Sequence, residues 1–185
     1  VNMTAFFEAL SLGRSSTSEA LAIFDDLDTV DIDFMIGSWK GAGFPTDHPW
    51  DGLLETYHWF GKCFKSPEAV QPLVFTTANG GKSNVNPIWM IPVVNLIHQK
   101  WVPKSRIAGR LFQMCIPIFS TKRARARLRM THYRGKESAT MIYDNLPIND
   151  VFRKVDRGTV FGVMDLKNLE QPFFFVLRRE HCAKS

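Results

Sequence analysis

Hydrophobic residues recur at helical spacing near the start of the chain, whereas most of the remaining chain alternates with the period of a strand. Ser16-Thr17-Ser18-Glu19 directly precedes Leu21 and Phe24, and a serine followed three residues later by glutamate is a typical helix start. A second short helix is predicted over residues 4–10. We therefore predict an N-terminal helical segment over residues 1–30 that packs as a lid on the rest of the domain.

Short runs of alternating polar and apolar residues dominate from residue 34 onward. Glycine-rich and aspartate-rich turns separate these runs, as expected for strands joined by tight links. The pattern predicts strands at residues 34–40, 73–77, 83–90, 125–134, 137–144, 151–156, 159–165 and 173–180. Many short strands with tight connections predict a mainly β domain, an antiparallel barrel or sandwich.

The strands at 125–134 and 137–144 are predicted to form a hairpin around Gly135-Lys136. This register pairs His132 with Ala139 and Leu128 with Tyr143 on the more apolar face. In a small barrel that face points into the cavity, so both polar side chains would need a partner or a ligand there. His132 and Tyr143 are therefore candidates for proton transfer to or from a bound carbonyl compound.

Two further segments are predicted to cover the domain. Asp51 is a good N-cap for a helix over residues 52–64, which would bring Glu55, His58 and Lys62 to one side as an acid–base cluster. Residues 91–119 contain three prolines around a predicted helix at 105–115, and this segment is either a flap over an opening or part of the core.

Length and charge limit the possible functions. With 185 residues, 45% of them hydrophobic, the chain supports one substantial core. The net charge is +5, and much of the excess lies in residues 122–129. There, arginines alternate with Ala126 and Leu128, which is typical of an exposed strand face and not of a nucleic-acid site. The sequence lacks a Ser-His-Asp order, a P-loop, GxGxxG and HExxH, which argues against hydrolase, nucleotide-binding and zinc-protease functions.

The cysteines indicate the cellular environment. Cys63, Cys115 and Cys182 are odd in number and have no metal-ligand spacing, so reduced thiols are expected. The sequence contains neither a signal peptide nor an apolar run of roughly 18 residues. We therefore expect a cytoplasmic protein without a membrane span, and we consider a homodimer as its assembly.

One stretch resembles a known family. Met35-Ile36-Gly37-Ser38-Trp39-Lys40-Gly41, with Asp51-Gly52-Leu53-Leu54-Glu55 and Trp59-Phe60-Gly61-Lys62 after it, is similar to the GXWXG domain, over about residues 33–90. Met141-Ile142-Tyr143-Asp144 and Pro172-Phe173-Phe174-Phe175 resemble the uncharacterised domain that accompanies it, over about residues 125–180. The two glycines around Trp39 suit a strand that packs tightly against its neighbours.

The resemblance implies a calycin-like (lipocalin-like) antiparallel β-barrel over residues 31–185, with one or two covering helices. In such barrels the equivalent of Trp39 closes one end and a late arginine packs across it, here Arg178 or Arg179. The group also includes haem proteins of the nitrobindin type. A haem-binding function would use His132 as the axial ligand, with His181 as the second candidate.

These observations predict a barrel that binds an apolar or aromatic small molecule and acts as a cofactor-independent isomerase or cyclase of secondary metabolism. No metal is expected. The alternatives are a non-catalytic carrier and a haem protein. The candidate catalytic residues are His132, Tyr143, His58 and Asp165, and the candidate ligand-binding residues are Trp39, Glu55, Trp59, Met130, Met141 and Phe161. Asp165 is included because it alternates with Phe161 and Val163, which are expected to point inward.

Overall fold

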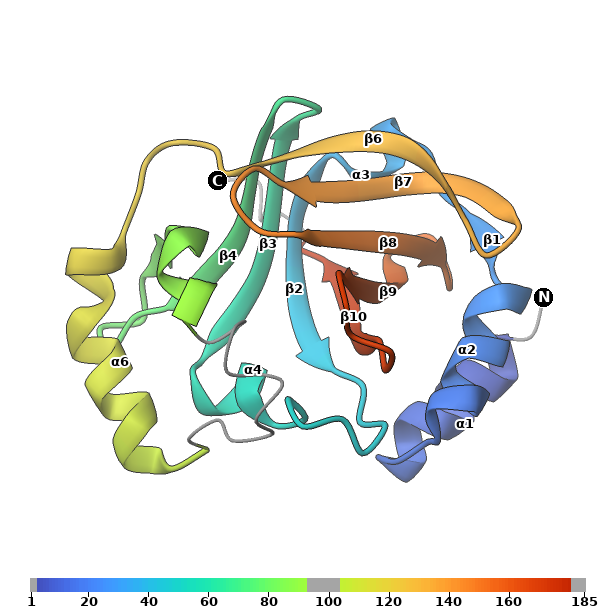
Figure 1. The fold of residues 1–185 in the computed structure, drawn as a ribbon, viewed down its shortest axis with the longest axis horizontal. Coiled ribbons are helices and arrows are strands. Elements are labelled where there is room, and N and C mark those ends of the chain that lie inside the picture. Colours follow the sequence, from blue (N-terminus) through green and yellow to red (C-terminus); the bar gives the residue numbers. More distant parts are fainter. Residues whose placement is uncertain (1–2, 93–103, 181–185) are drawn as a thin grey trace.

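The computed structural model describes residues 3–92 and 104–180, and in this part of the chain the fold is mainly β (Figure 1). The strands are β1 (Asp28–Thr29), β2 (Gly37–Gly43), β3 (Trp59–Ser66), β4 (Ala69–Thr76), β5 (Lys82–Asn84), β6 (Ala126–Tyr133), β7 (Lys136–Tyr143), β8 (Ile148–Lys154), β9 (Thr159–Leu166) and β10 (Phe173–Arg179). They form one antiparallel sheet in the order β1-β8-β7-β6-β4-β3-β2-β10-β9, with β5 on β4. Because β8 also pairs with β9, the hydrogen bonding closes into a ring.

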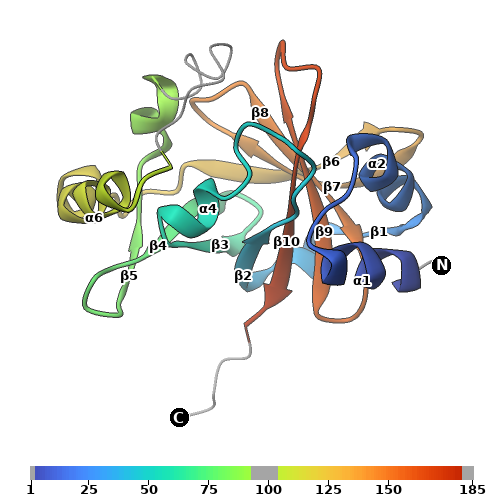
Figure 2. The same ribbon diagram turned by 90° about the horizontal axis from the view of Figure 1, so that it is seen from below.

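Helices lie at both ends of this sheet. They are α1 (Met3–Leu12), α2 (Thr17–Asp26), α3 (Ile32–Met35), α4 (Leu53–Thr56), the 3-10 turn η1 (Pro87–Met90) and α6 (Arg106–Phe119). Figures 1 and 2 show α1 and α2 at one end and α6 at the other. The Ser16–Glu19 capping box begins α2, and the Ser105 side chain caps α6, so both predicted helix starts are confirmed.

Two separate hydrophobic clusters hold the molecule together. The larger one fills the inside of the strand ring and includes Trp39, Phe64 and Phe152. The smaller one lies between the sheet and the N-terminal helices, where Phe6 and Phe24 both pack on the Phe161 ring and Phe6 also packs on Phe44. The helices α1 and α2 therefore cover the outer face of β9 and β10. The division of the chain at residue 30 remains a prediction.

Two glycines permit the close approach that the GXWXG stretch predicts. A Cβ on Gly41 would lie 2.0 Å from the Trp59 ring, and one on Gly61 would lie 2.0 Å from the Trp39 carbonyl oxygen. Gly61 also has a φ of +147°, which other residues rarely adopt. The Trp59 indole therefore packs directly on the backbone of Gly41, and this contact fixes Trp59 in place.

The predicted helix over residues 52–64 is wrong beyond its first turn. Helix α4 ends at Thr56, His58 adopts a left-handed φ of +59°, and β3 begins at Trp59. Pairing of β3 with both β2 and β4 stabilises the extended form here over the helix. The Asp51 carboxylate instead accepts hydrogen bonds from the amides of Thr46 and His48, so it caps a turn.

The hairpin of β6 and β7 is confirmed, but its predicted register is wrong by two residues. Arg134 and Gly135, both with positive φ, form the two-residue turn, and Tyr133 pairs with Lys136. The Arg134 guanidinium binds both carboxylate oxygens of Asp25, at 2.7 and 2.6 Å, which supports the arginine in this conformation. His132 therefore pairs with Glu137 instead of Ala139.

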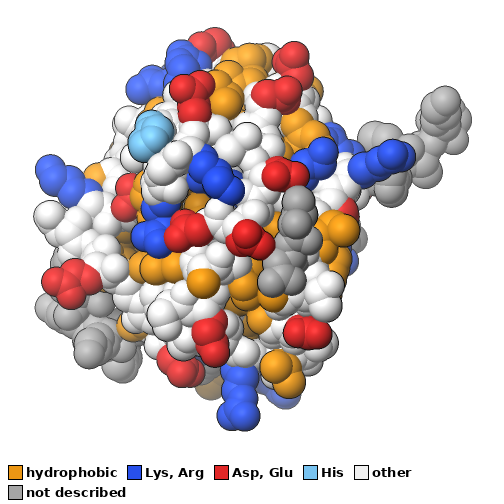
Figure 3. Space-filling model, turned by 90° about the vertical axis from the view of Figure 1, so that its right-hand side faces the viewer, with side chains coloured by type: hydrophobic (Ala, Val, Ile, Leu, Met, Phe, Trp, Pro, Cys, Tyr) orange, Lys and Arg blue, Asp and Glu red, His pale blue; other side chains and the backbone are white. Residues whose placement is uncertain are grey.

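The surface around the N-terminal helices carries interspersed acidic and basic side chains, without a large patch of one sign (Figure 3). Among the described residues, Cys63 and Cys115 are free thiols. None of the helices in this part of the chain combines the length and apolar character needed to cross a membrane.

Candidate functional site

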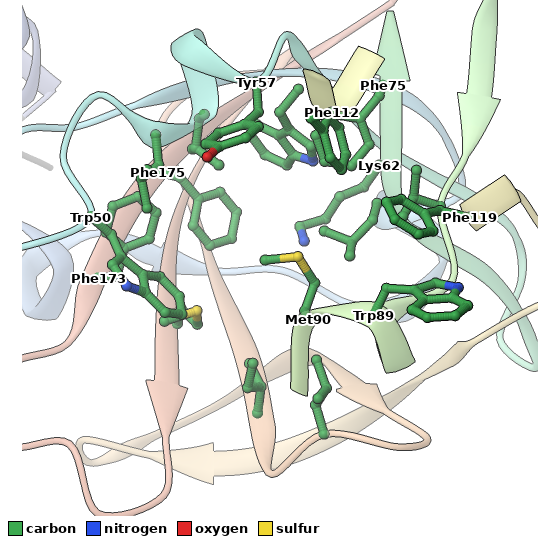
Figure 4. A pocket seen from close by; sticks show the side chains of 18 of the residues that line it. Trp50, Tyr57, Lys62, Phe75, Trp89, Met90, Phe112, Phe119, Phe173 and Phe175 are labelled. Carbon is green, nitrogen blue, oxygen red and sulfur yellow. The ribbon is translucent and has the colours of Figure 1, made fainter. Parts of the chain in front are cut away.

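An apolar cavity of about 490 Å³ lies between the inside of the strand ring and helix α6 (Figure 4). Aromatic and aliphatic side chains form most of its wall, and Phe112 and Phe119 of α6 close one side. The size is that of a site for a small organic molecule. Its lining residues are Trp50, Leu53, Leu54, Tyr57, Trp59, Lys62, Leu73, Phe75, Val85, Trp89, Met90, Ala108, Leu111, Phe112, Phe119, Tyr143, Leu146, Ile148, Asp150, Met164, Phe173 and Phe175.

A buried ion pair lies in the wall of this cavity. Lys62 Nζ on β3 is 2.7 Å from Asp150 Oδ2 on β8, and the two side chains are only 3% and 2% exposed. The same amine donates to the Pro72 carbonyl at 3.3 Å and makes a long contact of 3.5 Å with the Tyr143 hydroxyl. Three polar side chains from three strands therefore meet at one point of an otherwise apolar wall.

Aromatic rings surround the lysine amine. Lys62 Nζ lies 5.4 Å from the centroid of the Trp59 ring, 5.6 Å from Tyr143 and 5.1 Å from Phe175. Figure 4 shows the amine directed toward the open centre of the cavity, near Phe175 and Met90. Faces of aromatic rings stabilise a cation, and they do so most strongly where water is excluded.

Burial shifts the pKa of each member of this cluster toward its neutral form. Burial lowers the pKa of Lys62, and the negative charge of Asp150 offsets part of this shift. Burial likewise raises the pKa of Asp150, and the positive charge of Lys62 offsets part of that shift. Burial also raises the pKa of Tyr143 well above its ordinary value, and the Asp150 charge adds to this shift. Asp150 is thus a stronger base, and Lys62 a stronger acid, than the same groups in water.

Several buried polar atoms at the cavity wall lack a hydrogen-bond partner within the described residues. They are Asp150 Oδ1 and the indole N–H groups of Trp50 and Trp59. Buried polar groups are almost always paired, so these three atoms are unsatisfied positions in the wall, each enclosed by surrounding protein atoms in this structure.

Of the residues singled out from the sequence, Tyr143, Trp59 and Lys62 line the cavity. His132 and His58 are not buried in the core, and neither lines the cavity. His132 lies near the turn of the hairpin, where β6 extends beyond the cavity. The predicted placement of His132 inside the cavity is therefore wrong, and the structure does not bring it to Tyr143. The predicted helical cluster of Glu55, His58 and Lys62 does not form either, because α4 ends at Thr56 and Lys62 lies on β3.

Phe161 and Asp165 lie on the other face of β9. Phe161 is buried against the N-terminal helices, and Asp165 shares that outer side of the strand and is partly exposed. The alternation between them was predicted correctly, but its direction was wrong, because α1 and α2 supply a second apolar cluster that buries the outer face of the sheet.

The remaining candidates have structural contacts. Trp39 is fully buried, its indole donates to the Met35 carbonyl at 2.8 Å, and the Arg179 guanidinium lies 4.2 Å from its ring centroid, so the predicted arginine over this tryptophan is confirmed. Met141 is buried in the main core, whereas Met130 is 38% exposed. Glu55 accepts a hydrogen bond from the Gly43 amide at 2.9 Å, at the surface.

Sequence reasoning missed the central roles of Lys62 and Asp150. Lys62 was predicted on a helix beside Glu55 and His58, and Asp150 was not among the candidate site residues. The signal for Asp150 is the alternation Ile148, Asp150, Phe152, which places a carboxylate on an apolar strand face. Lys62 gave no such signal, because irregular pairing between β3 and β4 breaks the alternation around Gly61.

The cavity does not fit a haem-binding function in the described part of the chain. None of its described lining residues is a histidine, and His132, the expected axial ligand, is exposed. His181, the second candidate, lies outside the described residues. The described residues also contain no group of three or more His, Cys, Asp or Glu side chains that could hold a metal ion.

Two family models match the chain in its two halves. Residues 22–80 match the GXWXG protein family, and residues 124–179 match a domain of unknown function, DUF4334. The chain thus carries a segment similar to each of these two families, in this order. Together the matched segments supply both sides of the buried ion pair, because Lys62 lies in the first and Asp150 in the second.

One solved structure is similar to this chain over nearly its whole length. It is described as the crystal structure of protein from Thermomonospora curvata, and it shares 27% identity with a TM-score of 0.71. The match covers 97% of this chain and 98% of that chain, so the two share an overall fold. No curated protein matches this chain significantly.

Proposed function

We propose that the strand ring is a calycin-like β-barrel whose cavity binds an apolar or aromatic small molecule carrying a carbonyl group. The observation that carries this proposal is the buried Lys62–Asp150 pair in a wall that is otherwise apolar. Burying a charged pair in an apolar cavity costs stability, so packing alone does not explain why the pair is there. A single polar group at the end of an apolar ligand matches this arrangement.

The polar cluster favours a specific orientation of the ligand. In this proposal the Tyr143 hydroxyl donates to the carbonyl oxygen, and the Lys62 ammonium adds positive charge beside it. Asp150 lies beside Lys62 in the same wall, and its Oδ1, which has no partner among the described residues, is brought to the carbon next to the carbonyl when the ligand binds. An acceptor and several donors on the two sides of a carbonyl compound form the arrangement needed for enolisation.

The proposed reaction is a cofactor-independent isomerisation or cyclisation. Asp150 Oδ1 removes a proton from the carbon next to the carbonyl, the C–H electron pair forms a C=C bond, and the carbonyl π electrons move to the oxygen. Tyr143 and Lys62 stabilise that negative charge. Returning the proton from Asp150 to another carbon of the conjugated enolate gives an isomer, with atoms and charge balanced.

A non-catalytic carrier is the alternative, and one observation favours it. The Lys62 amine already has three acceptors, namely Asp150 Oδ2, the Pro72 carbonyl and the Tyr143 hydroxyl. A cluster whose amine already has its hydrogen-bond partners can hold the polar end of a ligand without any catalytic step.

Deuterium exchange separates the two functions without knowledge of the natural substrate. A panel of aryl alkyl ketones is incubated with the protein in D2O, and incorporation next to the carbonyl is followed by NMR. We expect the wild type to accelerate exchange and Asp150→Asn to lose most of it, about 100-fold or more for a general base. His132→Ala, at an exposed position, is the matched control and should keep the rate. Binding of ketones without any exchange would leave the carrier function.

A further inference from the structure

Helix α6 carries a continuous apolar stripe on its outer surface. Ile107, Leu111, Met114 and Ile118 are 71%, 58%, 76% and 73% exposed. Their spacing of four, three and four residues places them along one side of a helix. Exposed single apolar residues are normal, but four in one stripe mark a surface that another phase or molecule covers.

The same helix is firmly attached by its other side, so the stripe is not the result of a displaced helix. Ile116 is buried, and a Cβ on Gly109 would lie 2.5 Å from the Thr56 carbonyl oxygen. The Gln113 side chain donates to the Thr76 carbonyl at 3.0 Å. Helix α6 is therefore apolar on two sides, one packed on the protein and one exposed.

The stripe is continuous with the cavity. Leu111 belongs both to the stripe and to the cavity wall, and Phe112 and Phe119 follow on the inner side of the helix. Trp89, which is 50% exposed and also lines the cavity, packs on Phe119 with ring centroids 4.9 Å apart. Only the Leu111 side chain therefore separates an apolar molecule at the stripe from the cavity.

Arginines flank the opposite edge of the stripe. At 100° per residue, Arg110 lies about 60° and Arg106 about 100° from Ile107, away from the residues that face the cavity. Both are exposed, and neither has a carboxylate within 4.0 Å among the described residues. The helix thus presents a positive edge, an apolar centre and a cavity, in that order.

The charge of the surrounding sequence is equally one-sided. Between Ala69 and Lys136 the chain has twelve Lys and Arg residues and no Asp or Glu. All 18 acidic residues of the chain lie outside this stretch. A second copy of the chain docking through α6 would bring the arginine edges together without a carboxylate on either helix, which disfavours a homodimer through this face.

We propose that the outer face of α6 docks on an anionic lipid surface, so that apolar ligands pass between the bilayer and the cavity. Basic residues beside an apolar helix face are the pattern of interfacial helices, and the exposed Trp89 suits the headgroup region. The transfer step rests on the proposed ligand-binding function, whereas docking itself does not. The interaction is peripheral.

Cosedimentation tests docking directly, without any ligand. The full chain is mixed with vesicles of phosphatidylcholine alone or with about one third phosphatidylserine. We expect binding to the anionic vesicles, lost at high salt, and weakened about 25-fold in Arg106→Gln/Arg110→Gln because each arginine near the surface contributes about a fivefold gain. Met114→Ser/Ile118→Ser should lose binding too, and both positions are exposed, so the fold should persist.

Leu12→Ser is the matched apolar control and Arg14→Gln the matched charge control, because both residues are exposed near the end of α1, away from α6. Equal binding to both vesicle types, or binding unchanged in the α6 variants, would overturn the inference. So would a dimer in sedimentation experiments that Met114→Ser/Ile118→Ser dissociates, since the face would then be an interface between two chains.

The transfer of pyrene from anionic vesicles to the protein distinguishes a failure of membrane docking from a failure of ligand binding in the cavity. If the protein takes up pyrene while it is docked on a vesicle, the transfer rate should increase with vesicle concentration. If pyrene first dissolves in water, the rate should not depend on vesicle concentration. Pyrene uptake without vesicle binding would overturn the docking inference and leave the cavity in place. Vesicle binding without pyrene uptake would support docking and contradict the proposed ligand site.

Discussion

Lys62 Nζ lies 2.7 Å from Asp150 Oδ2, and this contact joins β3 to β8 across the inside of the strand ring. The two strands are not neighbours in the sheet, so the ion pair is a direct link between opposite walls. It is also the only close carboxylate–amine contact among the described residues in which both side chains are buried. The pair therefore affects both stability and the polarity of the cavity.

Breaking the pair from one side should cost more stability than removing it. We expect Lys62→Met to lower the free energy of unfolding by about 3–5 kcal/mol, because Asp150 is left buried without its cation. The double variant Lys62→Met/Asp150→Leu should recover much of this loss. Urea denaturation measures both, and a double variant as unstable as the single one would show that the pair is not the source of the cost.

Gly41→Ala should disturb the site as well as the fold. The added Cβ would lie 2.0 Å from the Trp59 ring, and Trp59 lines the cavity. Overpacking of this kind costs about 1–3 kcal/mol, and the ring must shift to relieve it. We expect a lower melting temperature and weaker binding of an apolar probe.

Gly80→Ala is the control for that substitution. Gly80 has a positive φ, of 81°, but an added Cβ meets nothing within 4 Å, so only the cost of the backbone conformation remains, about 1 kcal/mol. Probe binding should be unchanged. Equal effects of the two alanines on probe binding would contradict the contact between Gly41 and Trp59.

His48 should make the fold sensitive to acid. Burial lowers its pKa from 6.5 to about 4, while its Nδ1 accepts a hydrogen bond from the Trp50 amide. As the pH falls below 6.5, the unfolded chain gains a proton that the folded chain does not, so stability decreases until the pH reaches the folded pKa. The loss attributable to this residue is about 3 kcal/mol.

NMR titration of the imidazole and urea denaturation at several pH values check this prediction. His48→Asn keeps an oxygen acceptor for Trp50 but does not titrate, so its stability should fall less between pH 6.5 and 4 than that of the wild type. An imidazole that titrates near 6.5 in the folded protein would contradict the burial of this side chain.

Phe161→Ala should destabilise the protein without affecting ligands. The side chain is fully buried between α1, α2 and the outer face of the sheet, so truncation should cost about 3–5 kcal/mol. Because the cavity lies on the other face, the affinity for an apolar probe should be unchanged at temperatures where the variant is folded. A large loss of affinity would place Phe161 on the cavity side after all.

The sequence predicted the strands better than it predicted their surroundings. Short alternating runs and the Ser16 and Ser105 caps depend on neighbours along the chain, and β6 to β10 and both helix starts lie close to where they were expected. By contrast, β3 was predicted as a helix, and most of the strand predicted at 83–90 is a 3-10 turn. The register of the β6–β7 hairpin was wrong because Arg134 takes a left-handed conformation that an ion pair with Asp25, far away in the sequence, supports. Local turn preferences contain no information about that partner.

The candidate site illustrates the same limit. Tyr143 was found because it lies on the more apolar face of the predicted hairpin, whereas Trp59 lines the cavity although it was predicted within a helix. Lys62 and Asp150 were not given their roles, because each is an ordinary charged residue until the ring closes and buries both. Phe161 was assigned to the wrong face because one sheet buries both of its sides, which alternation alone does not distinguish.

Lys62, Tyr143 and Asp150 are proposed to make one point of an apolar cavity selective for a carbonyl oxygen. Titration calorimetry with an aryl ketone and the matching hydrocarbon without oxygen tests this selectivity most directly. We predict that the ketone binds about tenfold more tightly, as one good hydrogen bond provides, and that this difference disappears in Tyr143→Phe and Lys62→Met. Equal affinities for ketone and hydrocarbon in the wild type, or a preference that survives both substitutions, would contradict the proposed site.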